Sequence, residues 1–187
     1  MKRYHYLLTA SLLFCAYPGM TQKSYDLQQL LRDGKLVTYN RKVSPINEGG
    51  KKGISATGIV WLKDVNFSEG TIEVFQKSFI GIAFYGVDTI TYDAVYFRPF
   101  NFVTQDPVRK IHAVQYISEP DFPWHRLREE QNGKYEKEVN PAPSPNDWFH
   151  ARIEVNDGQV RVYVNGSETP SLTVKKLNAR KEGMIGI

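Results

Sequence analysis

Polar side chains with planar hydrogen-bonding groups are concentrated in residues 94–117, among aromatic and β-branched residues. The group comprises Arg98, Asn101, His112 and Gln115, with Tyr96 and Tyr116 beside them. Aromatic rings can cover the C–H faces of a sugar, while amides and a guanidinium satisfy its hydroxyls. This stretch therefore predicts a surface for a polyhydroxylated ligand such as a carbohydrate. Two alternatives stay open, namely that the tyrosines only pack in strands and that Arg98 pairs with a neighbouring acid.

A second group of reactive side chains lies in residues 118–146, a long segment rich in proline. Trp124 follows Pro123 and is a candidate platform for a sugar ring, which completes a ligand-binding set of Tyr96, Arg98, Asn101, His112, Gln115 and Trp124. His125 and Glu129 are candidate catalytic residues, because a histidine–carboxylate pair can act as a general base while Arg98 steadies an oxyanion. The alternative is a solvated, charged turn. Loops of this length are usually functional or disordered.

Metal binding is not indicated by any ligand spacing, so no metal ligand is predicted. His112, His125 and His150 lie too far apart in the sequence for a zinc motif. Calcium is possible at loop oxygens, for which the candidates are Asp64, Asn66, Asp88 and Asp93.

The N-terminus has the pattern of an export signal over residues 1–22. Lys2 and Arg3 precede an apolar run over residues 6–16, and cleavage is expected near Gln22. This predicts a secreted or periplasmic protein. A lipoprotein with lipid on Cys15, the single cysteine, fits less well because Phe14 rather than a small residue precedes it. No later apolar run is long enough to span a bilayer.

Length and charge point to one domain, predicted over residues 23–187. The net charge of +4 comes from scattered lysines and arginines without a basic stripe, which argues against nucleic acid as a partner. Strands are predicted at residues 36–39, 54–62, 71–75, 79–87, 94–98, 112–117, 148–155, 159–164, 171–174 and 183–187. Residues 44–53 read as a polar loop, and residues 23–34 as a weak helix or a strand-and-turn.

Several segments together resemble a known family. They are FSEGTIEV, GIAFYGVDTITYDAVYFRP, HAVQYI, and WFHARIEVNDGQVRVYVNG followed by a GMIGI end. These are similar to the concanavalin A-like lectin/glucanase group, and within it to laminin G-like and 3-keto-disaccharide hydrolase domains. The resemblance implies an all-β jelly-roll sandwich of two antiparallel sheets, with Arg98 and Gln115 on the concave sheet. In this group the last strand usually continues, so we expect either a truncated chain or an open sheet edge.

The resemblance leaves three functional hypotheses. The first is a secreted carbohydrate-binding domain that recognises a glycan on its concave sheet. The second is a glycan-acting hydrolase or lyase of the 3-keto-glycoside type that uses residues 118–130. The third is a structural protein–protein interaction module. Glucanases of this group carry three acids at alternate strand positions, and the nearest match here, Glu69 and Glu73 around Thr71, lacks that motif.

Overall fold

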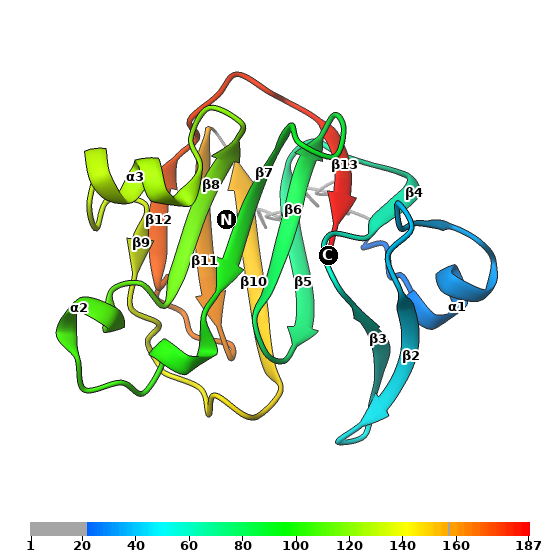
Figure 1. The fold of residues 1–187 in the computed structure, drawn as a ribbon, viewed down its shortest axis with the longest axis horizontal. Helices are drawn as coiled ribbons and strands as arrows, with labels where there is room; N and C mark the ends of the chain where they lie inside the picture. Colours follow the sequence, from blue (N-terminus) through cyan, green and yellow to red (C-terminus); the bar gives the residue numbers. More distant parts are fainter. Residues whose placement is uncertain (1–21, 157) are drawn as a thin grey trace, which may run out of the picture.

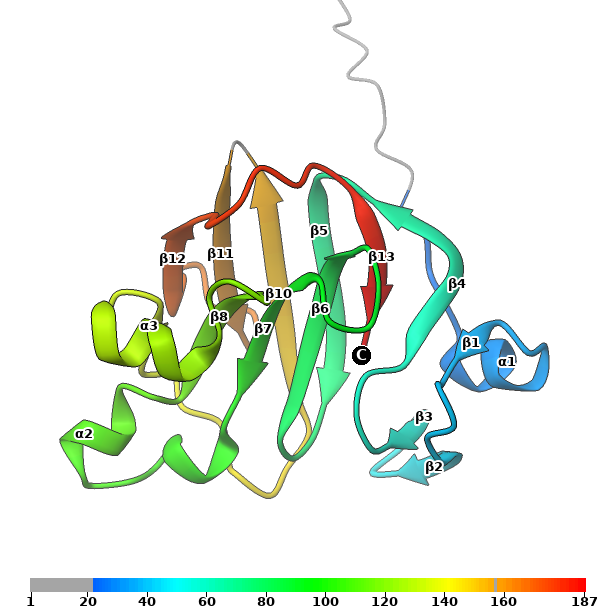
Figure 2. The same cartoon turned by 45° about the horizontal axis from the view of Figure 1, so that its top comes forward.

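The computed structural model describes residues 22–156 and 158–187, so the predicted export signal lies, apart from Gln22, outside the described residues. Within them the chain forms two antiparallel sheets packed face to face, with a separate hairpin at one side (Figures 1 and 2). The all-β sandwich predicted from the sequence is therefore confirmed.

One sheet has seven strands in the spatial order β1 (Leu36–Val37), β4 (Trp61–Phe67), β13 (Gly183–Gly186), β6 (Ile80–Gly86), β7 (Tyr92–Phe97), β8 (Val114–Glu119) and β9 (Glu136–Lys137). The other has four, in the order β12 (Leu172–Lys175), β11 (Gln159–Val164), β10 (Phe149–Asn156) and β5 (Gly70–Gln76). Strands β2 (Val43–Glu48) and β3 (Lys51–Ala56) form the hairpin. The helical segments are α1 (Leu27–Arg32), η1 (Pro99–Asn101), α2 (Pro107–Lys110) and α3 (Trp124–Glu130).

The core lies between the two sheets. β10 alternates strictly, with Phe149, Ala151, Ile153 and Val155 buried, because successive side chains of a strand point to opposite faces. Phe149 meets Phe97 of β7 edge to face, with ring centroids 5.3 Å apart. This contact identifies the inner face of the seven-stranded sheet.

The opposite face of that sheet carries the predicted binding residues. Along β7, Phe97 points to the core, so Tyr96 and Ala94 point away from it. Tyr96 is paired with Gln115 of β8 and with Gly81 of β6, and paired residues share a face. We call this side, with Ala94, Tyr96 and Gln115, the outer face.

Two predictions for the N-terminal half need correction. Residues 44–53 are not a loop but most of the β2–β3 hairpin, because Gly49 and Gly50 take the left-handed conformation that a tight hairpin turn requires. The strand expected over residues 54–62 is interrupted at Gly58, also left-handed, and β4 starts only at Trp61. For residues 23–34 the structure agrees with the helix alternative, because α1 occupies Leu27–Arg32. Gln28 of α1 donates to the backbone oxygens of the hairpin residues Ile46 and Gly53.

The long segment after β8 is also more ordered than predicted. It contains α3 and β9, and its side chains Leu127 and Tyr135 are buried. A helix of seven residues without a polar N-cap gives little sequence signal, and tertiary packing of Leu127 stabilises it instead. No helix in residues 22–156 or 158–187 has the length and apolar character to cross a membrane.

The last strand occupies the interior of the seven-stranded sheet. β13 pairs with β4 on one side and, through Met184 and Gly186, with β6 on the other. Close packing demands glycine at both ends of β13, since a Cβ on Gly183 would lie 2.5 Å from the carbonyl carbon of Tyr85. A Cβ on Gly186 would lie 2.9 Å from the Trp61 ring.

Candidate functional site

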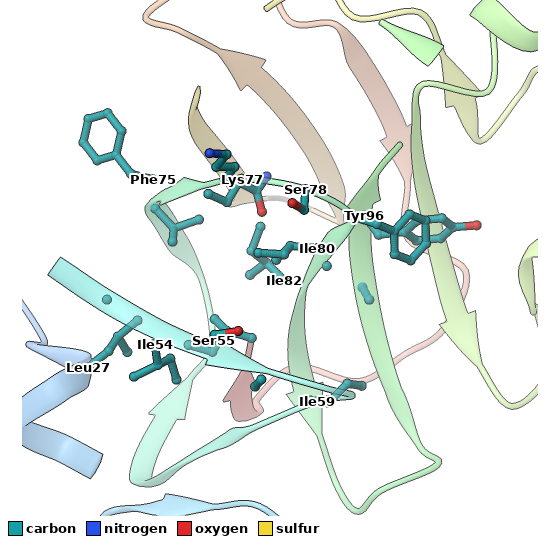
Figure 3. Close-up of a pocket in the computed structure, with 18 of the residues that line it drawn as sticks. Leu27, Ile54, Ser55, Ile59, Phe75, Lys77, Ser78, Ile80, Ile82 and Tyr96 are labelled. Carbon is teal, nitrogen blue, oxygen red and sulfur yellow. The ribbon is translucent and has the colours of Figure 1, made fainter. Parts of the chain in front are cut away.

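A groove of about 1560 Å³ runs across the outer face and on to the β2–β3 hairpin. One end is bounded by Trp124 and Arg128 of α3, and its floor includes Ala94, Tyr96 and Arg98. The other end passes round β6 towards the hairpin. It is lined there by Ile54 of the hairpin and by Ile80 and Ile82, which pair with Phe97 and Val95 and so share the inner face (Figure 3).

Three of the predicted residues form one hydrogen-bonded cluster in this groove. The Arg98 guanidinium donates to the Tyr96 hydroxyl (2.6 Å) and to Gln115 Oε1 (2.9 Å). The Tyr96 hydroxyl donates in turn to the same Gln115 oxygen at 2.7 Å. Arg98 is therefore held by neutral partners rather than by the acid that one alternative proposed. We call Tyr96, Arg98 and Gln115 the outer-face cluster.

Two further predicted residues support this cluster from behind. Arg98 Nη1 donates to the backbone oxygen of His112 (2.8 Å), and Asn101 Nδ2 donates to the same oxygen at 3.3 Å. The imidazole of His112 lies 2.7 Å from the buried Glu136, which also pairs with Arg128 at 2.9 Å. His112 and Asn101 do not line the groove, and their contacts fix the position of Arg98.

Trp124 lies at the rim of the groove. Its side chain is 47% exposed, and the Arg128 guanidinium lies 5.1 Å from its ring. Gln115 Nε2 donates to the Trp124 backbone oxygen at 3.3 Å, which ties α3 to β8. The Arg128 guanidinium beside the indole and the Gln115 amide bonded to the backbone together hold the Trp124 ring at the groove.

Sequence reasoning missed two residues near this end of the groove, one that lines it and one behind it. Phe79, which is exposed, lies with its ring centroid 5.6 Å from that of Tyr96 and adds a second aromatic surface. It begins an apolar run that reads as a central strand, and nothing in that run marks its first residue as exposed. Glu136 belongs to a two-residue strand that no alternation reveals.

Some predicted residues lie elsewhere. Tyr116 points to the core, where its hydroxyl donates to Asp93 at 2.8 Å. Asp93 is consequently not a loop ligand for calcium, because it is a buried residue of β7. Trp61 is buried, whereas Trp148 is only half-buried and lies against Gly49 of the hairpin.

The two candidate catalytic residues lie on the exposed side of α3. Neither His125 nor Glu129 lines the groove, and both side chains are exposed. Glu119, at the end of β8, is the acid of this region that does line it. Burial raises the pKa of Glu119, and the nearby charge of His125 opposes that shift.

Burial also changes the ionisation of the outer-face cluster. It raises the pKa of Tyr96 to about 12, against the pull of Arg98. It lowers the pKa of Arg98, which nevertheless stays charged because a guanidinium starts from a very high value. The groove floor therefore offers a cation and a neutral phenol. No cluster of three or more His, Cys, Asp or Glu that could hold a metal is found among the described residues.

Comparison with models of known protein families shows to which family the chain is related. The model of the 3-keto-alpha-glucoside-1,2-lyase-like domain matches residues 94–187. The chain belongs to this family. The matched region begins in β7 and includes β8, α3 and all members of the outer-face cluster. No curated protein sequence matches the chain.

Solved structures show the fold. The carbohydrate-binding module CBM66 from Bacillus subtilis superimposes with a TM-score of 0.54 at 13% identity, covering 81% of this chain and 85% of the module. A Bacillus subtilis protein with a galectin-like fold has a TM-score of 0.46 at 13% identity, covering 80% and 82%. The Bacillus licheniformis β-glucanase has a TM-score of 0.43 at 16% identity, covering 82% and 67%. The first of these supports a concanavalin A-like sandwich.

Proposed function

We propose that this protein binds a carbohydrate in the groove on its outer face, with Trp124 as the stacking surface. The observation that carries the proposal is the adjacency of an exposed indole to a buried, charged hydrogen-bonding cluster. A sugar ring stacked on Trp124 would present its hydroxyls toward Arg98, whose position is already fixed by Tyr96 and Gln115. Such preorganisation lowers the entropic cost of binding.

Family membership and the CBM66 likeness add to this proposal. The family description names an alpha-glucoside, and the module named for carbohydrate binding shares the fold. Fold alone does not determine function, so the contacts in the groove must be tested directly.

The first test is retention on insoluble polysaccharides in a pull-down, compared between wild type and Trp124→Ala. We expect at least about tenfold weaker retention, because a central aromatic contact is a typical binding hot spot. Phe100→Ala is the matched control, since Phe100 is an equally exposed aromatic outside the groove. Equal retention of wild type and Trp124→Ala would contradict the role of Trp124 as the stacking surface. No retention of the wild type would contradict carbohydrate binding and favour a protein–protein module.

A second variant tests the cluster. Arg98→Lys keeps the charge but loses the planar fork, in which Nη2 reaches Tyr96 and Gln115 while Nη1 reaches the His112 backbone oxygen. We expect this variant to be retained less on polysaccharide than the wild type. Its melting temperature is measured as well, so that a loss of binding can be distinguished from a loss of folding.

A second function, cleavage of a glycan by hydrolysis or elimination, is favoured by Glu119. This acid lines the groove, and burial raises its pKa, which is the direction that favours a general acid. Release of reducing ends or keto-sugars from a substrate panel would support it, provided that Glu119→Gln abolishes release. His125→Ala and Glu129→Ala test the original candidates in the same assay. If no substrate is turned over while retention persists, the protein is a binding domain.

Export is part of the proposal, because carbohydrate polymers are encountered outside the cytoplasm. N-terminal sequencing of the protein from its native source should find a mature start near Lys23. A chain that retains Met1 would contradict export by cleavage of a signal peptide.

A further inference from the structure

Arg98 is a buried charge without a counter-ion. It lines the groove and is only 9% exposed, yet no carboxylate in residues 22–156 or 158–187 forms an ion pair with its guanidinium. Its hydrogen-bond partners are a phenol, an amide oxygen and a backbone carbonyl. Arginine is rarely buried without a partner of opposite charge, because removing a charge from water is costly. A ligand that brings a negative group would supply the missing partner.

Neighbouring groups do not neutralise this charge. Burial raises the pKa of Tyr96 to about 12, so its phenol is uncharged at neutral pH. Glu136 is a buried acid behind the cluster, but it pairs with Arg128 at 2.9 Å and with the His112 imidazole at 2.7 Å. This network therefore holds two guanidiniums, of Arg98 and Arg128, against the single carboxylate of Glu136. It has an excess of positive charge even when His112 is neutral.

Glu119, the acid of this region that lines the groove, is too distant to serve as the counter-ion. It ends β8, and the rise of a strand places it roughly 13 Å from Gln115, which contacts Arg98. That distance exceeds the screening length at physiological salt, which is about 8 Å.

The uncompensated charge lies beside the stacking surface of the proposed sugar site. One amide joins the two: Gln115 Oε1 accepts from Arg98 at 2.9 Å, and Gln115 Nε2 donates to the Trp124 backbone oxygen at 3.3 Å. The hydrogen bonds of Arg98 to the protein do not use all the N–H donors of a guanidinium, so donors remain for a ligand. A sugar that stacks on Trp124 thus has a charged donor next to it.

We propose that the sugar bound in this groove is an acidic one, whose carboxylate or sulfate group pairs with Arg98 while its ring stacks on Trp124. This inference rests on the proposed carbohydrate function and narrows it to glycans that carry negative charge. The anion completes the charge balance of the outer-face cluster, and its charge-assisted hydrogen bond is stronger than one to a neutral hydroxyl. A neutral glycan leaves Arg98 without a counter-ion.

The test compares acidic oligosaccharides with their methyl esters, which keep the sugar ring and lose the charge. The carboxylate probes are oligomers of galacturonate, of mannuronate with guluronate, and of glucuronate with N-acetylglucosamine. Dextran sulfate beside dextran tests a sulfate group in the same way. Calorimetry at pH 7 measures each affinity. We expect at least one acidic probe to bind at least about tenfold more tightly than its neutral counterpart, and the probe that does so shows whether carboxylate or sulfate is preferred.

Two variants separate a specific contact from the general attraction of a basic protein to a polyanion. Arg98→Gln removes the buried charge and should lower the affinity for the acidic probe to that for its neutral counterpart. Arg126→Gln removes an exposed charge outside the groove and should leave the preference unchanged. The comparison of acid with ester uses the wild type, so the test stays decisive even if Arg98→Gln does not fold.

The results distinguish this inference from the proposed function. Equal affinity for acidic and neutral probes overturns the acidic preference and leaves carbohydrate binding in place. A preference that Arg126→Gln abolishes as fully as Arg98→Gln overturns the role assigned to Arg98. If no glycan of either kind is bound, the proposed function fails and this inference fails with it. Binding of an acidic probe that depends on both Arg98 and Trp124 supports both.

Discussion

Removing the Arg180 guanidinium should destabilise the sandwich substantially. Asp93 of β7 is 0% exposed and accepts hydrogen bonds from Tyr116, Asn178 and Arg180. Arg180 lies in the segment between β12 and β13 and its side chain is 18% exposed. The ion pair therefore fastens that segment to the strands that carry the outer-face cluster.

The loss of free energy of unfolding depends on which partners of Asp93 remain after Arg180→Met. Breaking a buried ion pair typically costs about 3–5 kcal/mol. We expect the lower end, about 3 kcal/mol, because Tyr116 and Asn178 still donate to the Asp93 carboxylate. For a domain of this size the melting temperature should fall by roughly 6–12 °C.

The assay is urea unfolding at pH 7, repeated for Asp93→Asn and for the double variant. The two changes should be less than additive by about 1–3 kcal/mol, because the double variant leaves no unpaired charge. Arg126→Met is the control: its ion pair with Glu130 is exposed, and such pairs contribute about 0.3–0.5 kcal/mol. A cost below about 1 kcal/mol for Arg180→Met, or strict additivity in the cycle, would refute the reasoning.

Other consequences can be checked in the same way. Gly86→Ala should reduce the free energy of unfolding by at least about 1–3 kcal/mol in urea, since its Cβ would lie 2.3 Å from the Trp61 ring. Gly53→Ala, where the nearest atom is 4.0 Å away, should be close to neutral. Leu127→Ala should cost about 2–5 kcal/mol by leaving a cavity under α3, and no change in the melting temperature would contradict its role as the anchor of that helix. Because the pKa of Tyr96 is raised to about 12 in the folded protein, stability should fall as pH rises from about 10, where an unfolded tyrosine ionises. The Tyr96→Phe variant should show a shallower loss over that range, and an unchanged slope would argue against a buried, neutral phenol.

The strands were predictable where apolar residues alternate with polar ones or follow one another without interruption. Residues such as Phe149, Ile153 and Val162 repeat with the period of two that one buried face demands. The hairpin around Gly49 was missed because Ser44, Asn47 and Lys52 give no such period: neither of its strands has a face buried in the core. α3 was missed because one buried leucine cannot signal a helix.

The candidate site was predictable in its residue types but not in its arrangement. Arg98 and Gln115 stood out as polar groups within apolar strands, and the register of β7 with β8 brings them into contact. His112 and Asn101 were chosen on the same grounds, yet they serve as supports for Arg98. Phe79 gave no signal, because its exposure depends on where β6 begins.

The sequence by itself determined the class of fold and which segment would carry polar side chains on an otherwise apolar sheet. Period-two alternation and turn residues are local, so a single chain displays them directly. The tertiary structure decided which polar groups meet and which acid enters the groove. Those features join residues far apart in the chain, as when Arg180 reaches Asp93, and no local pattern encodes such contacts.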